Sequence, residues 1–345
     1  MLVYWLLYFI PVTISFFSKR RSNILFFFVG FLLIFFIGFR FEVGGDWPSY
    51  IRHYNEMENI SLLDAIKKGD PGHRFLNWIM YQWDMGVYGV NFIYAIIFVW
   101  GLIRFSKSQP YPWIAITVAI PYLVIVVAMG YSRQGVAIGL FLLAITYLDK
   151  GKFKTYTFLI LFAALFHKTA LLLLPLGIFL YGKGKIIRIL MIIPIAYGAW
   201  DLLLAKEQNA LWQTYVEAQM QSQGAMIRVV MNLFPSLLFF YYKKEWKRYF
   251  NDYNFWYWIA LGSVLSVGLV SLSSTAVDRI ALYFIPIQLV VFSRLAFLAR
   301  KQLNPSLVKI LIIIFYLLIL LVWLVFASHA HNWLPYQNIM FQDLI

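Results

Sequence analysis

Four short polar clusters lie beside apolar stretches of this sequence, and their residue types could do chemistry on an anionic substrate. They are the run Arg40 to Tyr50 (RFEVGGDWPSY), Arg133 with Gln134, the run His167 to Ala170 (HKTA), and Asp278-Arg279 with Tyr283. An arginine can bind a phosphate through two parallel hydrogen bonds. A histidine is the natural general base near neutral pH, and an aspartate such as Asp46 can also accept a proton.

Each cluster also has an ordinary structural explanation. An arginine at a helix end can lay its stem on the apolar surface and reach lipid headgroups. The Gly-Gly-Asp-Trp-Pro run is also what a turn after a helix would contain, with Arg40 and Asp46 paired. A histidine near a membrane surface can be simple polar packing, and Asp278 can pair with Arg279 and leave Tyr283 at the interface.

The composition identifies an integral membrane protein. Of the 345 residues, 62% are hydrophobic and 13% are charged, whereas soluble domains are about 45–50% apolar and about 25% charged. The net charge of +14 is therefore expected to reflect cytoplasmic loops rather than nucleic-acid binding. Cysteine is absent from the sequence, which excludes a disulfide framework, a thiolate nucleophile and a cysteine-based metal site.

We expect an all-α bundle of about twelve membrane-spanning helices, because a span needs about 20 mostly apolar residues. The spans are expected near residues 2–17, 23–39, 88–105, 111–129, 135–148, 154–166, 169–181, 186–204, 228–242, 254–272, 277–298 and 307–327. The stretch 153–181 could be one long span, or two short ones that meet at the polar triplet His167-Lys168-Thr169. Two short spans are tolerated where the polar backbone between them lines a cavity.

The distribution of charge favours the two short spans. With Lys19-Arg20-Arg21 in the cytoplasm, the split places most of the 29 lysines and arginines, but few of the 15 acidic residues, in cytoplasmic loops. A single long span would move many of these basic residues outside, and the positive-inside bias would vanish. We therefore predict that both termini lie outside and that residues 1–345 form a single membrane domain.

The predicted outer side carries a long loop over residues 40–87 and a second one over residues 205–227. An interfacial helix is expected around Phe75–Trp83, with aromatic residues near one face. Four arginines begin or end spans on this side, against the positive-inside trend, which favours a shared role for them. These arginines are Arg40, Arg133, Arg228 and Arg279.

Taken together, the clusters resemble the EpsG family of bacterial polysaccharide proteins, which is related to the Wzy polymerases. The matching residues are Arg40, Gly44, Asp46 and Tyr50 in one run, Arg133-Gln134 at a span start, His167-Lys168-Thr169-Ala170, and Asp278-Arg279 followed by Tyr283. The resemblance extends from about Arg40 to Tyr283, in the order and topology of the family.

The resemblance implies a polymerase that joins undecaprenyl-pyrophosphate-linked oligosaccharides at the outer face of the bacterial cytoplasmic membrane, in capsule, O-antigen or exopolysaccharide biosynthesis. Such polymerases resemble metal-independent glycosyltransferases embedded in the membrane, so neither a metal nor a cofactor is expected. The implied partners are the lipid-linked donor and acceptor and the lipid bilayer, with a chain-length regulator and a flippase beside them. No nucleic-acid partner is expected.

Under this interpretation, Arg133 and Arg279 stabilise the charge of the leaving pyrophosphate. His167 or Asp46 is the base that deprotonates the acceptor hydroxyl, and the basic neighbours of His167 favour it. The other residues assigned to substrate binding are Arg40, Tyr50, Arg74, Gln134, Lys168, Arg228, Asp278 and Tyr283.

Other membrane functions stay open at this stage. An O-antigen ligase or a sugar O-acyltransferase would also use arginine and histidine at a membrane interface, and a flippase or transporter for lipid-linked sugars is a further alternative. Transporters usually show inverted repeats and polar groups at mid-bilayer, and no repeat is evident here. The motifs GxxxxGK[ST], HExxH and GxSxG are absent, so ATP-driven pumping, zincin proteolysis and α/β-hydrolase chemistry have no support.

Overall fold

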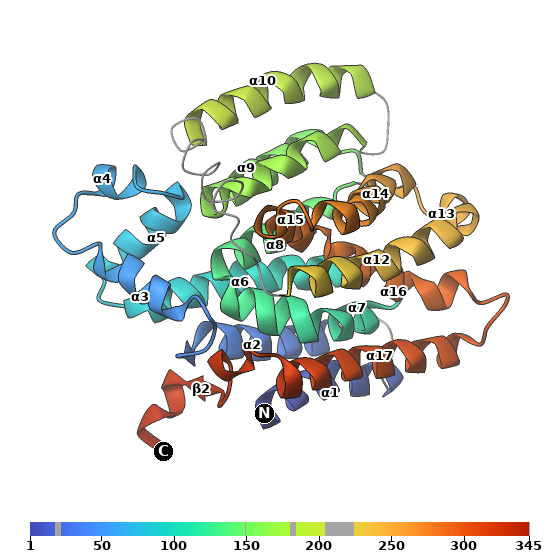
Figure 1. Cartoon of the computed structure of the whole chain (residues 1–345), viewed down its shortest axis with the longest axis horizontal. Coiled ribbons are helices and arrows are strands. Elements are labelled where there is room, and N and C mark those ends of the chain that lie inside the picture. Colours follow the sequence, from blue (N-terminus) through green and yellow to red (C-terminus); the bar gives the residue numbers. More distant parts are fainter. Residues whose placement is uncertain (18–21, 149, 180–183, 204–223, 345) are drawn as a thin grey trace. The chain divides into compact units, whose positions relative to one another are not determined.

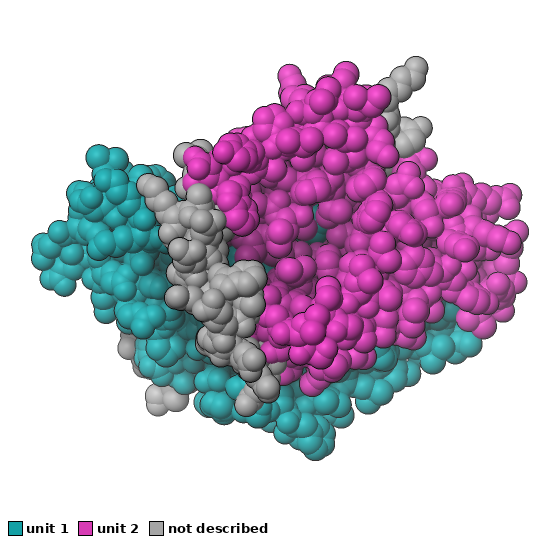
Figure 2. Space-filling model, turned by 45° about the horizontal axis from the view of Figure 1, so that its top comes forward, with its two compact units in different colours: residues 1–143, 165–167, 306–345 teal, residues 144–164, 168–305 magenta. Residues whose placement is uncertain are grey.

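The computed structural model describes residues 1–17, 22–148, 150–179, 184–203 and 224–344, and the described chain is almost entirely helical (Figure 1). The predicted all-α class is therefore confirmed. The basic run at residues 19–21 and most of the second predicted outer loop, residues 205–223, lie outside the described residues. The chain divides into two compact units (Figure 2): unit 1 holds residues 1–143, 165–167 and 306–345, and unit 2 holds residues 144–164 and 168–305.

Three helical runs of the described chain are long and apolar enough to cross a membrane alone. They are α6 (Gly86–Lys107), the run Ser274–Leu298 and α17 (Pro305–Phe326). Helices α12 (Ala225–Tyr241) and α13 (Lys243–Tyr249), which are bent by 73°, make a fourth if they count as one span. The full set of twelve spans and the outside position of both termini stay predictions.

Shorter apolar helices occupy most of the other predicted spans. They are α1 (Leu2–Phe17), α2 (Asn23–Gly38), α7 (Pro112–Ala119) with the π-helix η1 (Ile120–Ala128), α8 (Ser132–Ile145), α9 (Phe153–Phe166) and the 3₁₀ helix η2 (Lys168–Phe179). The predicted break at His167 is confirmed, because α9 ends at Phe166 and η2 begins at Lys168. The π-helix begins around Pro121, which cannot donate the backbone hydrogen bond that an α-helix needs.

In unit 1, a segment of short elements within the predicted outer loop lies at the end where α2 finishes and α6 begins (Figure 1). This segment consists of β1 (Arg40–Phe41), α3 (Trp47–Asn55), α4 (Leu62–Ile66) and α5 (Pro71–Gln82). Helix α5 begins with Asp70-Pro71, a helix-start sequence because proline at the first position needs no N–H partner. A helix is thus confirmed where the sequence predicted one at Phe75–Trp83.

Helices α6 and α8 of unit 1 meet backbone to backbone at two glycines. A Cβ atom on Gly101 would overlap the carbonyl oxygen of Gly139, and one on Gly139 would lie 2.6 Å from Cα of Phe98. Small residues allow helices to approach this closely in a membrane. The contact fixes the start of α8, which carries Arg133, against α6.

The C-terminal segment of unit 1 returns to strand β1. Strand β2 (Gln337–Asn338) pairs antiparallel with β1, with Arg40 opposite Asn338. Trp333 lies deeper, where its indole N–H donates to the carbonyl of Ile125 at 2.8 Å and its own carbonyl accepts from the hydroxyl of Tyr4 at 2.7 Å. The ends of the described chain therefore pack on the same helices.

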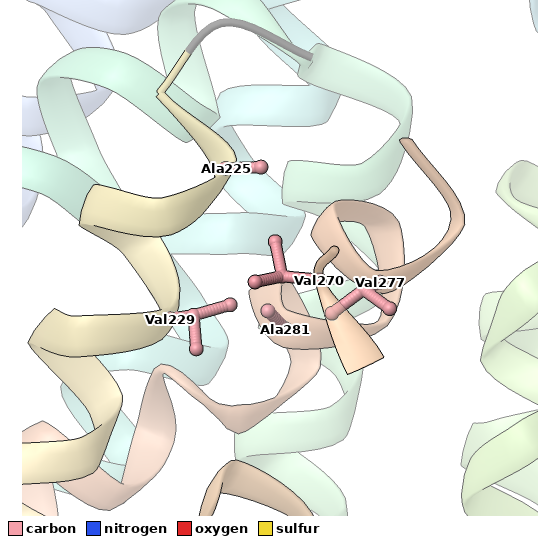
Figure 3. Packing of buried hydrophobic residues seen from close by; sticks show 5 residues of the cluster. All are labelled: Ala225, Val229, Val270, Val277 and Ala281. Carbon is pink, nitrogen blue, oxygen red and sulfur yellow. The ribbon is translucent and has the colours of Figure 1, made fainter. Parts of the chain in front are cut away.

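Unit 2 contains α9, η2, α10 (Lys185–Leu203), α12, α13, α14 (Tyr253–Leu269), α15 (Ser274–Ala281), η5 (Leu282–Phe284) and α16 (Pro286–Leu298). A small apolar cluster joins the start of α12 to α15 and to the end of α14 (Figure 3). It consists of Ala225, Val229, Val270, Val277 and Ala281. The cluster fixes the helix positions that carry the neighbouring residues Arg228 and Asp278.

A buried ion pair joins α16 to the residue that precedes α14. Both terminal nitrogens of Arg294 donate to the carboxylate of Asp252, at 2.8 and 2.7 Å, and the indoles of Trp246 and Trp256 each donate to it at 2.9 Å. Burial alone would raise the pKa of Asp252, but the charge of Arg294 and these hydrogen bonds lower it. The carboxylate is therefore ionised and holds four donors together.

Candidate functional site

Arg133 of unit 1 is a charged residue held at the start of α8. Its Nη1 lies 2.8 Å from Oδ2 of Asp70, the residue before α5. The Arg133 side chain is 33% exposed, whereas Asp70 is 10% exposed. An arginine has five N–H donors in a fixed fork, so it can pair with one carboxylate oxygen and present other donors to an anion.

Arg40 is fully buried, and it positions the start of α8 rather than facing solvent. Its guanidinium donates to the carbonyl of Ile37 (2.5 Å), the carbonyl of Val43 (3.2 Å), Oδ1 of Asn91 (3.1 Å) and Oγ of Ser132 (2.7 Å). These bonds join the end of α2, the turn after β1, α6 and α8. Because Ser132 precedes Arg133, the geometry supports a positioning role for Arg40.

Two histidines form a hydrogen-bonded pair beside Arg133. Nε2 of the buried His73, on α5, lies 3.1 Å from Nδ1 of His53 on α3. Nδ1 of His73 lies 2.7 Å from the hydroxyl of Tyr94 on α6. The amide of Asn77 donates to the carbonyl of His73 at 2.8 Å. These contacts form a continuous polar path from α6 to the half-buried His53.

Both histidines of this pair are neutral near pH 7. Burial and then the charge of Arg133 lower the pKa of His53 to about 4. Burial, again with Arg133, lowers the pKa of His73 well below its ordinary value. A neutral imidazole has one donor and one acceptor nitrogen, so each histidine of the path Tyr94–His73–His53 can donate one hydrogen bond and accept another.

This pair predicts that the protein loses stability below about pH 6.5. The unfolded chain binds protons on both histidines there, whereas the folded state lowers the pKa of both, that of His53 to about 4, so folding is penalised as the pH falls. Thermal denaturation of the purified protein at a series of pH values gives the free energy of unfolding. Its slope against pH should correspond to about one proton taken up on unfolding for each histidine. His53→Gln should reduce the slope, and His331→Gln, at an exposed histidine, should not. An unchanged slope in His53→Gln would contradict the assignment.

Asp46 and Tyr50 lie around the same arginine. Tyr50 is buried and its hydroxyl bonds to the backbone of Arg133, while burial and then the charge of Asp46 raise its pKa. Gly44 has φ +109°, and a Cβ there would lie 2.5 Å from the carbonyl oxygen of Met129. The glycine therefore allows the turn before α3 to approach the turn before α8, which brings Asp46 into the electrostatic surroundings of Arg133.

The remaining predicted residues of unit 1 have separate places. Arg74 on α5 pairs with Glu56 (2.6 Å) and donates to the carbonyl of Lys68 (2.5 Å). Gln134 is buried in α8. His167 is half-buried at the break after α9, at the point where the chain passes into unit 2.

In unit 2, Arg228 on α12 forms an ion pair with Asp278 on α15, and both side chains are 9% exposed. Arg279 is partly exposed on the same short helix. Thr169 donates to the hydroxyl of the buried Tyr283 at 3.2 Å, and Lys168 before it is 8% exposed. Asp278, Arg228, Thr169 and Tyr283 are thus connected in pairs within one unit.

The EpsG family model matches residues 23–338 of the chain. The chain belongs to the EpsG family. Membership of the EpsG family indicates a membrane protein of the polysaccharide polymerase type. No match is found among curated proteins or among solved structures.

The structure of this EpsG family member adds four polar residues that the sequence analysis did not select. They are His53, Asp70, His73 and Asn77, all from α3, α5 or their flanks. The Asp70-Pro71 helix start was the available signal, because an aspartate before a proline often begins a helix. Within the described residues, no three histidine, aspartate or glutamate side chains gather closely enough to hold a metal ion.

Proposed function

We propose that this EpsG family protein is a glycosyltransferase that polymerises undecaprenyl-pyrophosphate-linked oligosaccharide repeats at the outer face of the cytoplasmic membrane. Two observations support the proposal: the family match over residues 23–338 and the partly exposed Arg133, held by Asp70 within a polar cluster. The position of Arg133 is the observation that supports the reaction itself, because it provides a fixed positive charge with hydrogen-bond donors available to a pyrophosphate.

In the proposed reaction, a hydroxyl oxygen of the acceptor repeat attacks the anomeric carbon of the growing glycan. The new glycosidic bond forms as the bond from that carbon to the pyrophosphate oxygen breaks, and the pyrophosphate leaves with the electron pair. The hydroxyl proton passes to a base. Donors fixed around the leaving group stabilise its developing charge in a site of low dielectric.

For unit 1, we assign Arg133 to the leaving pyrophosphate and Arg40 to positioning it through Ser132. Although burial alone would lower the pKa of Arg133, Tyr50 and Asp46 lie close enough to raise it. We assign both to contacts with the glycan. Gln134 and Arg74 keep their proposed role in substrate binding. Arg74 is expected to act at the edge of the cluster, because Glu56 already pairs with it.

For unit 2, we carry forward the sequence-based assignment of Arg279 to the charge of a pyrophosphate, with Lys168 in support. The pairs Arg228–Asp278 and Thr169–Tyr283 are proposed to shape the substrate-binding surface of that unit. In unit 1, His167, at the break between α9 and η2, is our first choice for the base, and Asp46 is the second. The neutral His53–His73 pair offers a route for the released proton towards the outside.

The test is deletion of the gene, followed by sizing of the surface glycan on a gel. If the protein is a polymerase, its deletion should reduce the surface glycan from long polymer to single repeat units. These repeats should still reach the outer face on their lipid carrier. Complementation with the wild-type chain should restore long polymer, and Arg52→Gln, at an exposed arginine of α3, should do so equally well.

Two other outcomes would contradict the proposal. Long polymer that stays on its lipid carrier, or that changes only in acylation, would indicate a ligase or an O-acyltransferase. Accumulation of lipid-linked repeats on the cytoplasmic side would indicate a flippase.

We also propose a chain-length regulator as a partner of this protein. If it is one, removal of the regulator should change the length of the polymer.

A further inference from the structure

A basic pocket lies in unit 2 between α13 and the turn after α16. It encloses about 430 Å³ of space open to solvent. Four exposed cations line it, against a single carboxylate, that of Glu245. The cations are Lys244, Arg248, Arg300 and Lys301. None of them belongs to the clusters described above, so the pocket is a separate candidate site.

The two arginines of this pocket are ordered by aromatic rings. The guanidinium of Arg300 lies 3.8 Å from the ring centre of Phe297 and 4.7 Å from that of Tyr249. The guanidinium of Arg248 lies 5.5 Å from the ring centre of Tyr249, and Arg300 also donates to the carbonyl of Phe297 at 2.7 Å. Such contacts limit the motion of the side chains, so an anion would find the charges already arranged.

The surroundings of the pocket have the character of a membrane interface. Helix α13 bends by 73° away from the apolar α12, and it buries Trp246 while its lysines and arginine stay exposed. Exposed tyrosines flank it at Tyr241 and Tyr249. Tyrosine and tryptophan concentrate at the level of lipid headgroups, so a pocket at this depth faces headgroups.

We propose that this pocket binds the phosphate of an anionic phospholipid headgroup. Basic pockets beside membrane helices on the cytoplasmic side bind such headgroups, and the charge distribution of the sequence predicts that α13 lies on that side. The site differs from the proposed polymerisation chemistry, because it holds lipid to fix the protein in the bilayer rather than to react. A headgroup fits better than a free anion, since Tyr249 and Leu298 also line the pocket and offer the lipid an apolar contact beside the cations.

The experiment titrates the purified full-length protein in detergent with phosphatidylglycerol or phosphatidylcholine and counts bound lipids by native mass spectrometry. The wild-type protein should bind one phosphatidylglycerol more tightly than phosphatidylcholine. The double variant Arg248→Gln/Arg300→Gln should weaken this binding about tenfold, because it removes both guanidinium groups from the pocket lining and with them the charge-assisted hydrogen bonds to the phosphate. The control Lys243→Gln/Lys247→Gln removes two charges from the same helix outside the pocket and should change the affinity less than twofold.

Several results would overturn the proposal. An equal loss in the control variant would mean general charge attraction without a site, and equal binding of the two lipids would mean no headgroup selectivity. Pocket-dependent binding of inorganic phosphate without phosphatidylglycerol binding would assign the site to a free anion. Pocket-dependent binding of a polyglutamate peptide in place of the lipid would assign it to an acidic protein. Because all substituted side chains are exposed, unchanged melting temperatures serve as the check on folding.

Discussion

Replacing Arg133 by lysine is expected to slow polymerisation by about 10²–10³-fold, the effect typical of losing one donor to a developing negative charge. Lysine keeps a positive charge near Asp70, so the buried carboxylate stays compensated. It loses the planar fork that binds a phosphate through two parallel bonds. The rate should be measured with purified protein and lipid-linked repeats, by the appearance of repeat pairs on a gel.

Two matched variants separate a role in binding the pyrophosphate from a structural role. Arg52→Lys makes the same change at an exposed arginine of α3 and should keep the wild-type rate. Asp70→Asn removes the partner of Arg133 but keeps its guanidinium, so it should retain more activity than Arg133→Lys. If the rates of both site variants simply follow their melting temperatures, Arg133 is structural and the assignment fails.

The second large effect is expected at Asp252. Its replacement by alanine leaves Arg294 buried without a counter-charge and removes the acceptor of two indole N–H groups. Breaking one side of a buried ion pair costs about 3–5 kcal/mol in the free energy of unfolding. Denaturation of the detergent-solubilised protein, monitored by tryptophan fluorescence, measures the loss.

The control for Asp252 is an aspartate whose ion pair is exposed. Asp64 lies 3.7 Å from Lys67, with both side chains more than 60% exposed, and Asp64→Ala should destabilise the protein far less, because solvent screens an exposed ion pair. Asp252→Asn should fall between the two, because it keeps an acceptor for one indole but loses the charge. Equal melting curves for Asp252→Ala and Asp64→Ala would contradict the importance of the pair.

The sequence analysis succeeded where a local rule was sufficient. The break at His167 was predicted from the positive-inside rule and three polar residues, and α9 and η2 indeed separate there. The helix at Phe75–Trp83 was predicted from the spacing of its aromatic residues and is present as α5. Arg133 was selected because a charge at a span end is costly unless it has a partner, and its partner is Asp70.

Neither Asp70 as the partner of Arg133 nor the His53–His73 pair could be identified without the tertiary structure. His53 and His73 are 20 residues apart on separate short helices, and neither stands beside an apolar span. Only the packing of α3 and α5 on α6 brings them to Tyr94. Residue types alone gave them no more weight than the exposed His331.

Arg40 and Gly44 illustrate a different limit. The sequence analysis assigned Arg40 to substrate binding and noted Gly44 in the same run as part of the family resemblance. In the structure, Gly44 approaches the backbone of Met129, and Arg40 donates to groups of the chain itself. A pattern can predict that a donor must find an acceptor, but it cannot say whether that acceptor is substrate or protein.

The pairing of Arg40 with Asn338 has a consequence for the synthesis and membrane insertion of the protein. Strand β1 leaves the ribosome almost 300 residues before its partner β2, which is about 15–60 s at ordinary rates of synthesis. Throughout that time the edge of β1 and the surface that receives Trp333 have no partner from this chain. All the predicted spans before α17 can therefore be inserted well before β2 pairs with β1 beside Arg40, and a chain that stalls within α17 would be membrane-embedded without this pairing.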